Sequence, residues 1–147
     1  MANIQEKVRE RVWAVIIDSN KILLINRIKG GNSYWVIPGG AVEQGETHKQ
    51  AVKRECLEEL GIKVRVEGLF LQRISDKPGM EGQREFFYLC SIIGGKVGSG
   101  QGPEFQPGTH YKGKYKISWV NLRELPNINL KPQEVKDKII QEYLVSK

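Results

Sequence analysis

Short apolar runs alternate with turn-forming clusters over most of the chain, a pattern that is typical of a protein rich in β-strands. Val8–Asp18 and Lys21–Ile28 are β-branched and aliphatic runs separated only by Ser19-Asn20, which predicts two antiparallel strands joined by a tight hairpin. Lys29–Ser33 is rich in glycine and polar residues, and we expect a loop there. Tyr34–Ile37 then predicts a short strand that ends at the following proline, which lacks a backbone N–H.

Three further runs predict strands in the second half of the chain. Val64–Ile74 and Glu85–Ile93 are separated by a turn-rich stretch, so we expect a second hairpin. Lys114–Val120 alternates apolar and polar side chains with the period of two that a half-buried strand shows. Gly94–Gly108 contains six glycines and two prolines, which excludes a regular element. Because loops of this length are often functional, we expect a substrate loop there.

Two segments show helical spacing. Thr47–Leu60 begins with Thr47 and Gln50, which form a capping box, and Gly61 follows its last turn as the residue type that often ends a helix. Pro132–Val145 has proline at its first turn and apolar residues at helical spacing. We therefore expect one central and one terminal helix.

The order of elements and the composition indicate a broad class. Strands, a central helix, more strands, a short helical turn at Leu122–Leu125 and a terminal helix predict an α/β (α+β) fold, in which a central mixed β-sheet carries helices on its faces. The 147 residues suit a single domain over residues 1–147, and 39% hydrophobic residues are too many for a disordered chain. The longest apolar run, Val12–Ile17, is far shorter than the roughly 20 residues of a membrane helix, so we expect no membrane partner.

The charge and the cysteines add two expectations. Lysine and arginine outnumber aspartate and glutamate by 23 to 17, and the net charge of +6 attracts nucleotides and nucleic acids alike. A solubilising surface charge explains the same number. Cys56 and Cys90 lie inside apolar patterns, and residues 1–7 have no apolar run typical of a signal peptide, so we expect a reduced, cytoplasmic protein.

The helix predicted at 47–60 carries three glutamates on one face. At about 100° per residue, Glu55, Glu58 and Glu59 fall within an arc of roughly 100° beside the apolar stripe. Like charges at this spacing repel one another, so we expect something to offset the repulsion. A hard divalent cation such as Mg²⁺ binds carboxylate oxygens of this kind together with water and phosphate oxygens. A solvated acidic face with lysine partners is the alternative.

The residues around these glutamates follow a longer pattern. Its charged and glycine positions are Gly40, Glu46, Arg54, Glu55, Glu58, Glu59 and Gly61. This segment, residues 40–62, resembles the Nudix box of the MutT-like hydrolase superfamily. One position departs from the pattern: Cys56 stands where the family usually has a larger aliphatic residue, and we expect the thiol to fill the same core position. The Trp35–Gly40 entry and the Trp119–Leu125 exit also look like that family.

The resemblance implies a Nudix-type α/β/α sandwich and a reaction. That reaction is the Mg²⁺-dependent hydrolysis, with Mn²⁺ as a substitute, of a phosphoanhydride bond in a nucleoside diphosphate linked to a further group X. Metal ions lower such a barrier by neutralising developing charge, while a carboxylate orients and deprotonates water. Carried onto this sequence, the metal ligands would be the Gly39 carbonyl and the carboxylates of Glu55, Glu58 and Glu59. Glu58 or Glu59 would double as the base.

Other acidic and basic residues are expected to support the reaction. Arg54 lies off the arc of ligands, and its spacing to Glu58 together with the family pattern suggests that it orients Glu46 or Glu58. Family members often recruit a further acid from outside the box as base or ligand. Glu104, in the glycine-rich loop, is our first choice for that acid, and Glu85 is the second.

The sequence pattern constrains the substrate contacts less. Arg27, on the second predicted strand, is our first choice for binding phosphate. The further candidates are Arg73, Arg84 and Lys112. The candidates for stacking a nucleobase are Tyr34, Trp35, Phe105 and Tyr111, although a tryptophan at a strand end is as often part of the core. His48 projects near the carboxylates, and we expect it to be non-catalytic.

Three functions are compatible with the sequence. The first is a pyrophosphohydrolase for a small nucleotide, the second an RNA 5′-end pyrophosphohydrolase, and the third a domain that senses a nucleotide without cleaving it. No run of lysine and arginine exceeds two residues, which disfavours a track for a nucleic acid strand, and the intact acids disfavour a pure binder. We therefore expect a compact polyphosphate rather than a nucleic acid as substrate. A homodimer, common among relatives, stays open.

Overall fold

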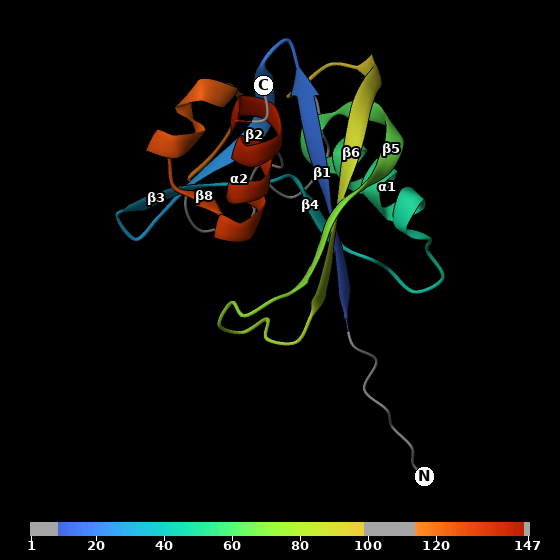
Figure 1. The fold of residues 1–147 in the computed structure, drawn as a ribbon. Helices are drawn as coiled ribbons and strands as arrows, with labels where there is room; N and C mark the ends of the chain where they lie inside the picture. Colours follow the sequence, from blue (N-terminus) through green and yellow to red (C-terminus); the bar gives the residue numbers. More distant parts are fainter. Residues whose placement is uncertain (1–8, 99–113, 146–147) are drawn as a thin grey trace.

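The computed structural model describes residues 9–98 and 114–145 (Figure 1). The strands are β1 (Glu10–Asp18), β2 (Lys21–Lys29), β3 (Asn32–Val36), β4 (Gly39–Ala41), β5 (Ile62–Ile74), β6 (Arg84–Gly95), β7 (Lys114–Asn121) and β8 (Leu130–Lys131). The helices are α1 (His48–Leu60), the 3₁₀ helix η2 (Leu122–Asn127), α2 (Gln133–Ile140) and the π-helical turn η3 (Gln141–Val145).

The strands form one mixed, curled sheet. Its order is β5-β6-β1-β2-β3-β8, with β4 beside β1 and β7 beside β2. β1 runs antiparallel to β2 and β4 but parallel to β6, and β3 runs parallel to β8. The mixed sheet expected from the sequence is therefore confirmed.

Helices cover both faces of the sheet, and the alternation of side chains along β1 shows how. Val12, Ala14 and Ile16 are buried in the core that includes α1, whereas Val15 is buried in the core that includes α2 and η2. A strand that is buried on both faces carries a continuous apolar run, which explains the sequence of β1. The α/β/α sandwich is confirmed, with α1 on one side of the sheet and α2 on the other (Figure 1).

The two hairpins predicted from the sequence are confirmed. Ser19 and Asn20 have φ values of 52° and 65°, both positive as a two-residue type I′ turn requires. Asp18 pairs with Lys21 directly across this turn. β5 and β6 form the second, longer hairpin and pair over most of their length.

Several boundaries differ from the sequence prediction, and β6 continues through Gly94 and Gly95, where no regular element was expected. The loop expected at Lys29–Ser33 is wrong in extent, because Gly30-Gly31 makes the whole turn with positive φ and Asn32 already belongs to β3. The strand before Pro38 ends as expected, but Gly39–Ala41 then pairs with β1 as β4. This extra pairing anchors the segment that leads into α1.

α1 begins and ends where the sequence predicts. The Thr47 hydroxyl accepts a hydrogen bond of 3.1 Å from the Gln50 N–H, and the Gln50 side chain accepts one of 2.9 Å from the Thr47 N–H. Gly61 takes the left-handed conformation, with φ 78°, and donates its N–H to carbonyls of the last turn. Cys56 is buried in the core beneath the helix, as expected.

The C-terminal segment covers the other face of the sheet. α2 follows Pro132 and buries Val135 and Ile139, and the chain then continues as η3 instead of as α-helix. The short helical turn expected after β7 is η2. Both cysteines are buried and neither forms a disulfide. Over residues 9–98 and 114–145, no helix has the length and apolar character needed to cross a membrane.

Candidate functional site

The turn between β4 and α1 packs tightly on β1. Gly39 pairs with Trp13 in the antiparallel register of the two strands. A Cβ atom at Gly39 would lie 2.1 Å from the Val12 carbonyl oxygen and 2.7 Å from the Trp13 ring, so a side chain does not fit there. A Cβ atom at Gly40 would lie 2.6 Å from the Glu55 carboxylate. The two glycines therefore allow β1, β4 and the acidic face of α1 to approach one another closely.

The three glutamates of α1 lie in different environments. Glu59 has only 6% of its surface exposed, and its carboxylate accepts a hydrogen bond of 2.8 Å from the Gly39 N–H. The Glu55 side chain, against Gly40, is 18% exposed, whereas that of Glu58 is 46% exposed. On the acidic face, Glu59 is thus buried and held by β4, whereas Glu58 is accessible at the surface.

Arg54 joins the acidic side chains of the site. Its Nε and Nη2 donate to the two carboxylate oxygens of Glu46, at 2.6 and 3.1 Å, which makes a bidentate pair. Its Nη1 donates to Glu55 at 2.9 Å and to Glu58 at 3.3 Å, and Nη2 also donates to the Ala41 carbonyl at 3.0 Å. Arg54 therefore contacts both carboxylates that the sequence suggests for it, and Glu55 as well.

These contacts favour the charged form of each partner. The hydrogen bond from Arg54 lowers the pKa of Glu46 and outweighs the opposing effect of burial, and a hydrogen bond of 2.9 Å from the Glu43 N–H adds to the lowering. The hydrogen bond to Glu46 raises the pKa of Arg54, with a further contribution from Glu55, and outweighs the effect of partial burial. Both groups are therefore ionised at neutral pH.

The acidic cluster offers the donors that a hard divalent cation prefers, namely several carboxylate oxygens on one helix face. In the structure the protein itself holds these oxygens: Glu55 and Glu58 share one Arg54 nitrogen, and Glu59 is bonded to the Gly39 N–H. Accordingly, no three Asp, Glu, His or Cys side chains of the described residues are grouped for metal binding. The donor set nevertheless fits a divalent cation in kind.

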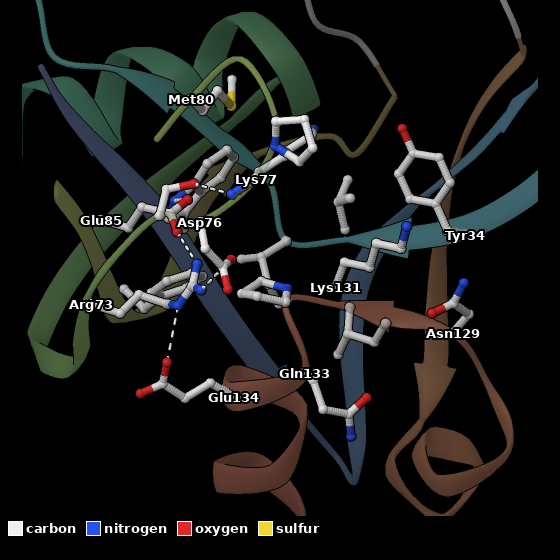
Figure 2. A pocket seen from close by; sticks show the side chains of 18 residues that line it. Tyr34, Arg73, Asp76, Lys77, Met80, Glu85, Asn129, Lys131, Gln133 and Glu134 are labelled. Carbon is white, nitrogen blue, oxygen red and sulfur yellow. Dashed lines mark hydrogen bonds and ion pairs between the residues drawn. The ribbon is translucent and has the colours of Figure 1, made fainter. Parts of the chain in front are cut away.

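A cleft of about 770 Å³ opens on the face of the sheet that α2 covers, between the β5–β6 turn and the segment before α2 (Figure 2). Trp13, Ile37 and Phe87 contribute apolar surface to it, and Lys131 Nζ lies 4.9 Å from the centroid of the Tyr34 ring at its edge. The charged side chains that line it are Arg73, Lys77, Lys131, Asp76, Glu85 and Glu134. Its volume lies within the range of about 300–1,000 Å³ that small-molecule sites occupy.

The cleft and the acidic cluster are neighbours across one pair of strands. Trp13 of β1 lines the cleft and pairs with Gly39 of β4. Ile37 also lines the cleft, and the Gly39 N–H, two residues further along the chain, holds Glu59. Trp13 and Ile37 therefore connect the cleft with the strand that holds Glu59.

The structure gathers most of the predicted reaction residues into one cluster. Its members are Gly39, Glu46, Arg54, Glu55, Glu58 and Glu59. His48 is held elsewhere: its ring nitrogens lie 2.6 Å from the Tyr88 hydroxyl and 2.8 Å from the Glu10 carboxylate. These contacts attach the first turn of α1 to β1 and β6.

Of the predicted substrate contacts that the structure describes, Tyr34 and Arg73 line the cleft, whereas Arg27, Trp35 and Arg84 do not. The Arg27 guanidinium lies over the Tyr115 ring, 5.3 Å from its centroid, and Trp35 packs against the core on the α2 face. Arg84 is exposed at the start of β6. Glu104, Phe105, Tyr111, Lys112 and most of the expected substrate loop fall outside the described residues, so their predicted roles stay predictions.

Sequence reasoning missed Trp13, which contacts both the cleft and Gly39. The residue stands inside an apolar run, where packing in the core is the ordinary expectation. The signal that was present is its alternation with Val12 and Ala14, which places its side chain on the opposite face of β1. The pairing of β1 with β4, which brings Gly39 next to Trp13, cannot be read from local pattern.

Comparison with known proteins shows what the chain is similar to. The family model described as NUDIX domain matches residues 7–143. The chain is 28% identical over 135 residues to the ADP-ribose pyrophosphatase of Methanocaldococcus jannaschii, an alignment that covers 90% of this chain and 71% of that protein. The crystal structure of a MutT NUDIX hydrolase from Burkholderia pseudomallei matches with a TM-score of 0.65 and 27% identity, covering 89% of this chain and 96% of that one.

Some relatives are much longer than this chain. Nudix hydrolase 6 of Arabidopsis thaliana is 27% identical over 94 residues, or 62% of this chain, and the chain spans only 33% of its length. The segment matched by the family model nevertheless includes every residue of the acidic cluster and all elements from β1 to α2.

Proposed function

The chain belongs to the Nudix family, and from this premise we propose that it is a divalent-metal-dependent pyrophosphohydrolase. The proposed substrate is a compact nucleoside diphosphate linked to a second group, of the nucleoside triphosphate, ADP-ribose or nucleotide-sugar type. One observation carries the proposal: Arg54 holds Glu46, Glu55 and Glu58 together beside Glu59, next to a cleft of ligand size.

The proposed reaction assigns different tasks to the groups of the cluster. Mg²⁺, or Mn²⁺ in its place, would be held by the Gly39 carbonyl and by Glu55, Glu58 and Glu59, and when bound supplies neutralisation of the charge on the pyrophosphate. Glu58 is the proposed base, because its carboxylate is the most exposed of the cluster on α1 and thus accessible to water. Glu59, buried and bonded to the Gly39 N–H, fixes β4 relative to the helix.

Arg54 is proposed to keep the acids ionised and in place. Its bidentate contact with Glu46 anchors the segment before α1, and its Nη1 holds Glu55 and Glu58. A guanidinium among carboxylates offsets their mutual repulsion, and the lowered pKa of Glu46 reflects the same interaction. Ionised carboxylates are the form that binds a cation and accepts a proton from water.

The cleft is the proposed place for the nucleoside or for the group X. Trp13, Tyr34 and Phe87 line it, and aromatic side chains of this kind suit a planar base. Among the described residues, its three basic and three acidic side chains balance in formal charge, which favours a neutral base or sugar over a chain of phosphates as the occupant. The archaeal relative is named ADP-ribose pyrophosphatase, which supports including ADP-ribose among the first compounds to test.

The test is a substrate panel assayed with and without Mg²⁺. The compounds are nucleoside triphosphates, ADP-ribose, nucleotide sugars, dinucleoside polyphosphates and RNA with a 5′-triphosphate. We expect metal-dependent cleavage of at least one small nucleotide, and a fall in kcat of about 100-fold or more in Glu58→Gln. Glu124→Gln, which alters an exposed glutamate of η2, is the matched control and should keep the wild-type kcat. Turnover of RNA alone, or binding without turnover, would overturn the proposal in favour of the RNA enzyme or the sensing domain.

A further inference from the structure

A buried carboxylate in the cleft has no task in the proposed reaction. Glu85 is 6% exposed, and both of its carboxylate oxygens are engaged. Oε2 accepts a hydrogen bond of 3.1 Å from the Trp13 indole N–H, and Oε1 pairs with the Arg73 guanidinium. A carboxylate held at both oxygens by an indole and a guanidinium is placed to fix its neighbours. This arrangement favours a positioning role over the role of general base that the sequence also allows.

Arg73 ties Glu85 to two further parts of the fold (Figure 2). Its Nε donates to Glu134 of α2 at 3.0 Å and its Nη2 donates to Asp76, in the β5–β6 turn, at 3.2 Å. Burial by itself would lower the pKa of Arg73, but the hydrogen bond to Glu134 and the charge of Glu85 outweigh it and raise that pKa. The guanidinium therefore stays charged and holds β5, β6 and α2 around Glu85.

The indole that Glu85 holds is also in contact with the acidic cluster. Trp13 pairs with Gly39, and a Cβ atom at Gly39 would come within 2.7 Å of the indole Cε3. Gly39 in turn donates its N–H to Glu59 at 2.8 Å. The Trp13 ring stacks with Phe87, with centroids 6.1 Å apart, and both side chains line the cleft. One side chain thus touches both the cleft and the strand that fixes Glu59.

We propose that Trp13 is a positioning residue: Glu85, itself paired with Arg73, clamps its indole, and the indole fixes Gly39, and through it the Glu59 carboxylate, relative to the occupant of the cleft. The kinetic part of this inference rests on the proposed function. Packing alone would make the indole contribute to stability only. A positioning role would make kcat depend on the hydrogen bond between the Trp13 indole and Glu85, because a displacement of about 1 Å near a reacting centre can lower a rate by about 100-fold.

The kinetic test compares Glu85→Gln with Glu67→Gln. Glu85→Gln keeps the shape of the side chain but removes the charge that pairs with Arg73 and weakens the hydrogen bond of the Trp13 indole. Glu67→Gln is the matched control, because Glu67 of β5 accepts a hydrogen bond of 2.7 Å from Ser91 of β6 and does not line the cleft. We expect Glu85→Gln to lower kcat by about 10-fold or more while KM changes by less than about threefold.

A second readout needs no turnover. In isotope-labelled protein, nuclear magnetic resonance follows the Trp13 indole N–H, identified by its loss in Trp13→Phe, and the Gly39 amide N–H. We expect Glu85→Gln to move both resonances and Glu67→Gln to move neither. If no compound of the panel is turned over, the proposed function fails. The Gly39 resonance then still shows whether the hydrogen bond between Glu85 and the Trp13 indole fixes the position of β4.

Two results would overturn the inference. The first is a Glu85→Gln variant whose indole resonance moves while the Gly39 resonance and kcat stay at their wild-type values. The second is a rise in KM alone, which would make Glu85 part of the cleft wall only. If Glu85→Gln does not fold, Trp13→Phe replaces it in the kinetic test, since phenylalanine keeps the contact with Phe87 but lacks the indole N–H. The same loss of kcat supports the inference, and an unchanged kcat overturns it.

Discussion

Replacing Arg54 with methionine tests the electrostatic reasoning most directly, because the residue holds several acids at once. Its side chain is 22% exposed and donates to Glu46, Glu55, Glu58 and the Ala41 carbonyl. Removing one partner of a buried ion pair destabilises a protein by about 3–5 kcal/mol, whereas an exposed pair contributes about 0–1 kcal/mol. Arg54 lies between these limits, so we expect Arg54→Met to lower the free energy of unfolding at neutral pH by about 2–3 kcal/mol.

The assay is urea unfolding followed by circular dichroism at a series of pH values. With an m-value of roughly 1–3 kcal/mol/M, the expected loss moves the midpoint by about 1 M or more. In the folded wild type the pKa of Glu46 is lowered from its ordinary value of 4.5. The stabilisation from Glu46 is therefore complete above that value and is lost as the pH falls through the folded pKa. The difference in stability between wild type and Arg54→Met should shrink over this acidic range.

Lys53→Met provides the matched control. Lys53 is the neighbouring cation on α1 and is exposed, so its replacement should change the free energy of unfolding by no more than about 0.5 kcal/mol. The reasoning is refuted if Arg54→Met proves as stable as Lys53→Met. It is also refuted if the deficit of Arg54→Met persists undiminished well below the ordinary pKa of glutamate.

Four other outcomes follow from local packing and burial. Gly39→Ala should destabilise the protein by about 1–3 kcal/mol in thermal unfolding, because its Cβ meets backbone. Gly40→Ala should lose less stability than Gly39→Ala but lose activity, because the atoms nearest to its Cβ are those of the Glu55 carboxylate, at the end of a side chain; equal stability losses for the two would contradict this. Thr47→Ala should remove about 1 kcal/mol by loss of the cap, measured in urea. Cys56 and Cys90 should resist alkylation in the native protein, checked by mass spectrometry, because burial raises the pKa of Cys56 and that of Cys90 to about 12.

α1 shows how much can be predicted from the sequence. The capping box at Thr47, the terminal Gly61 and the spacing of the glutamates all depend on residues within a few positions of one another, so local pattern is sufficient. The β1–β2 hairpin was predictable for the same reason, because Ser19-Asn20 determines its turn.

Trp13 shows why the rest could not be predicted. Its importance depends on pairing with Gly39 and on a hydrogen bond to Glu85, which lies 72 residues away in the sequence. Arg27 gives a second example, because the ring beneath it, Tyr115, comes from β7 near the other end of the chain. Contacts of this range follow from the order of the strands in the sheet, which the hydrophobic periodicity within each strand does not determine.

The two-sided sheet also bears on how such a protein evolves. The acidic side chains come from α1 and the segment just before it, whereas the cleft is lined largely by β3, the β5–β6 turn and the segment before α2. Under the proposed function, mutations in those lining segments can select new substrates while the hydrolytic chemistry is inherited unchanged. Trp13 is an exception, because its side chain touches both the cleft and Gly39, so a mutation there would affect substrate binding and the acidic cluster together. Descendants that diverge in substrate should therefore vary around the cleft and stay conservative at this tryptophan.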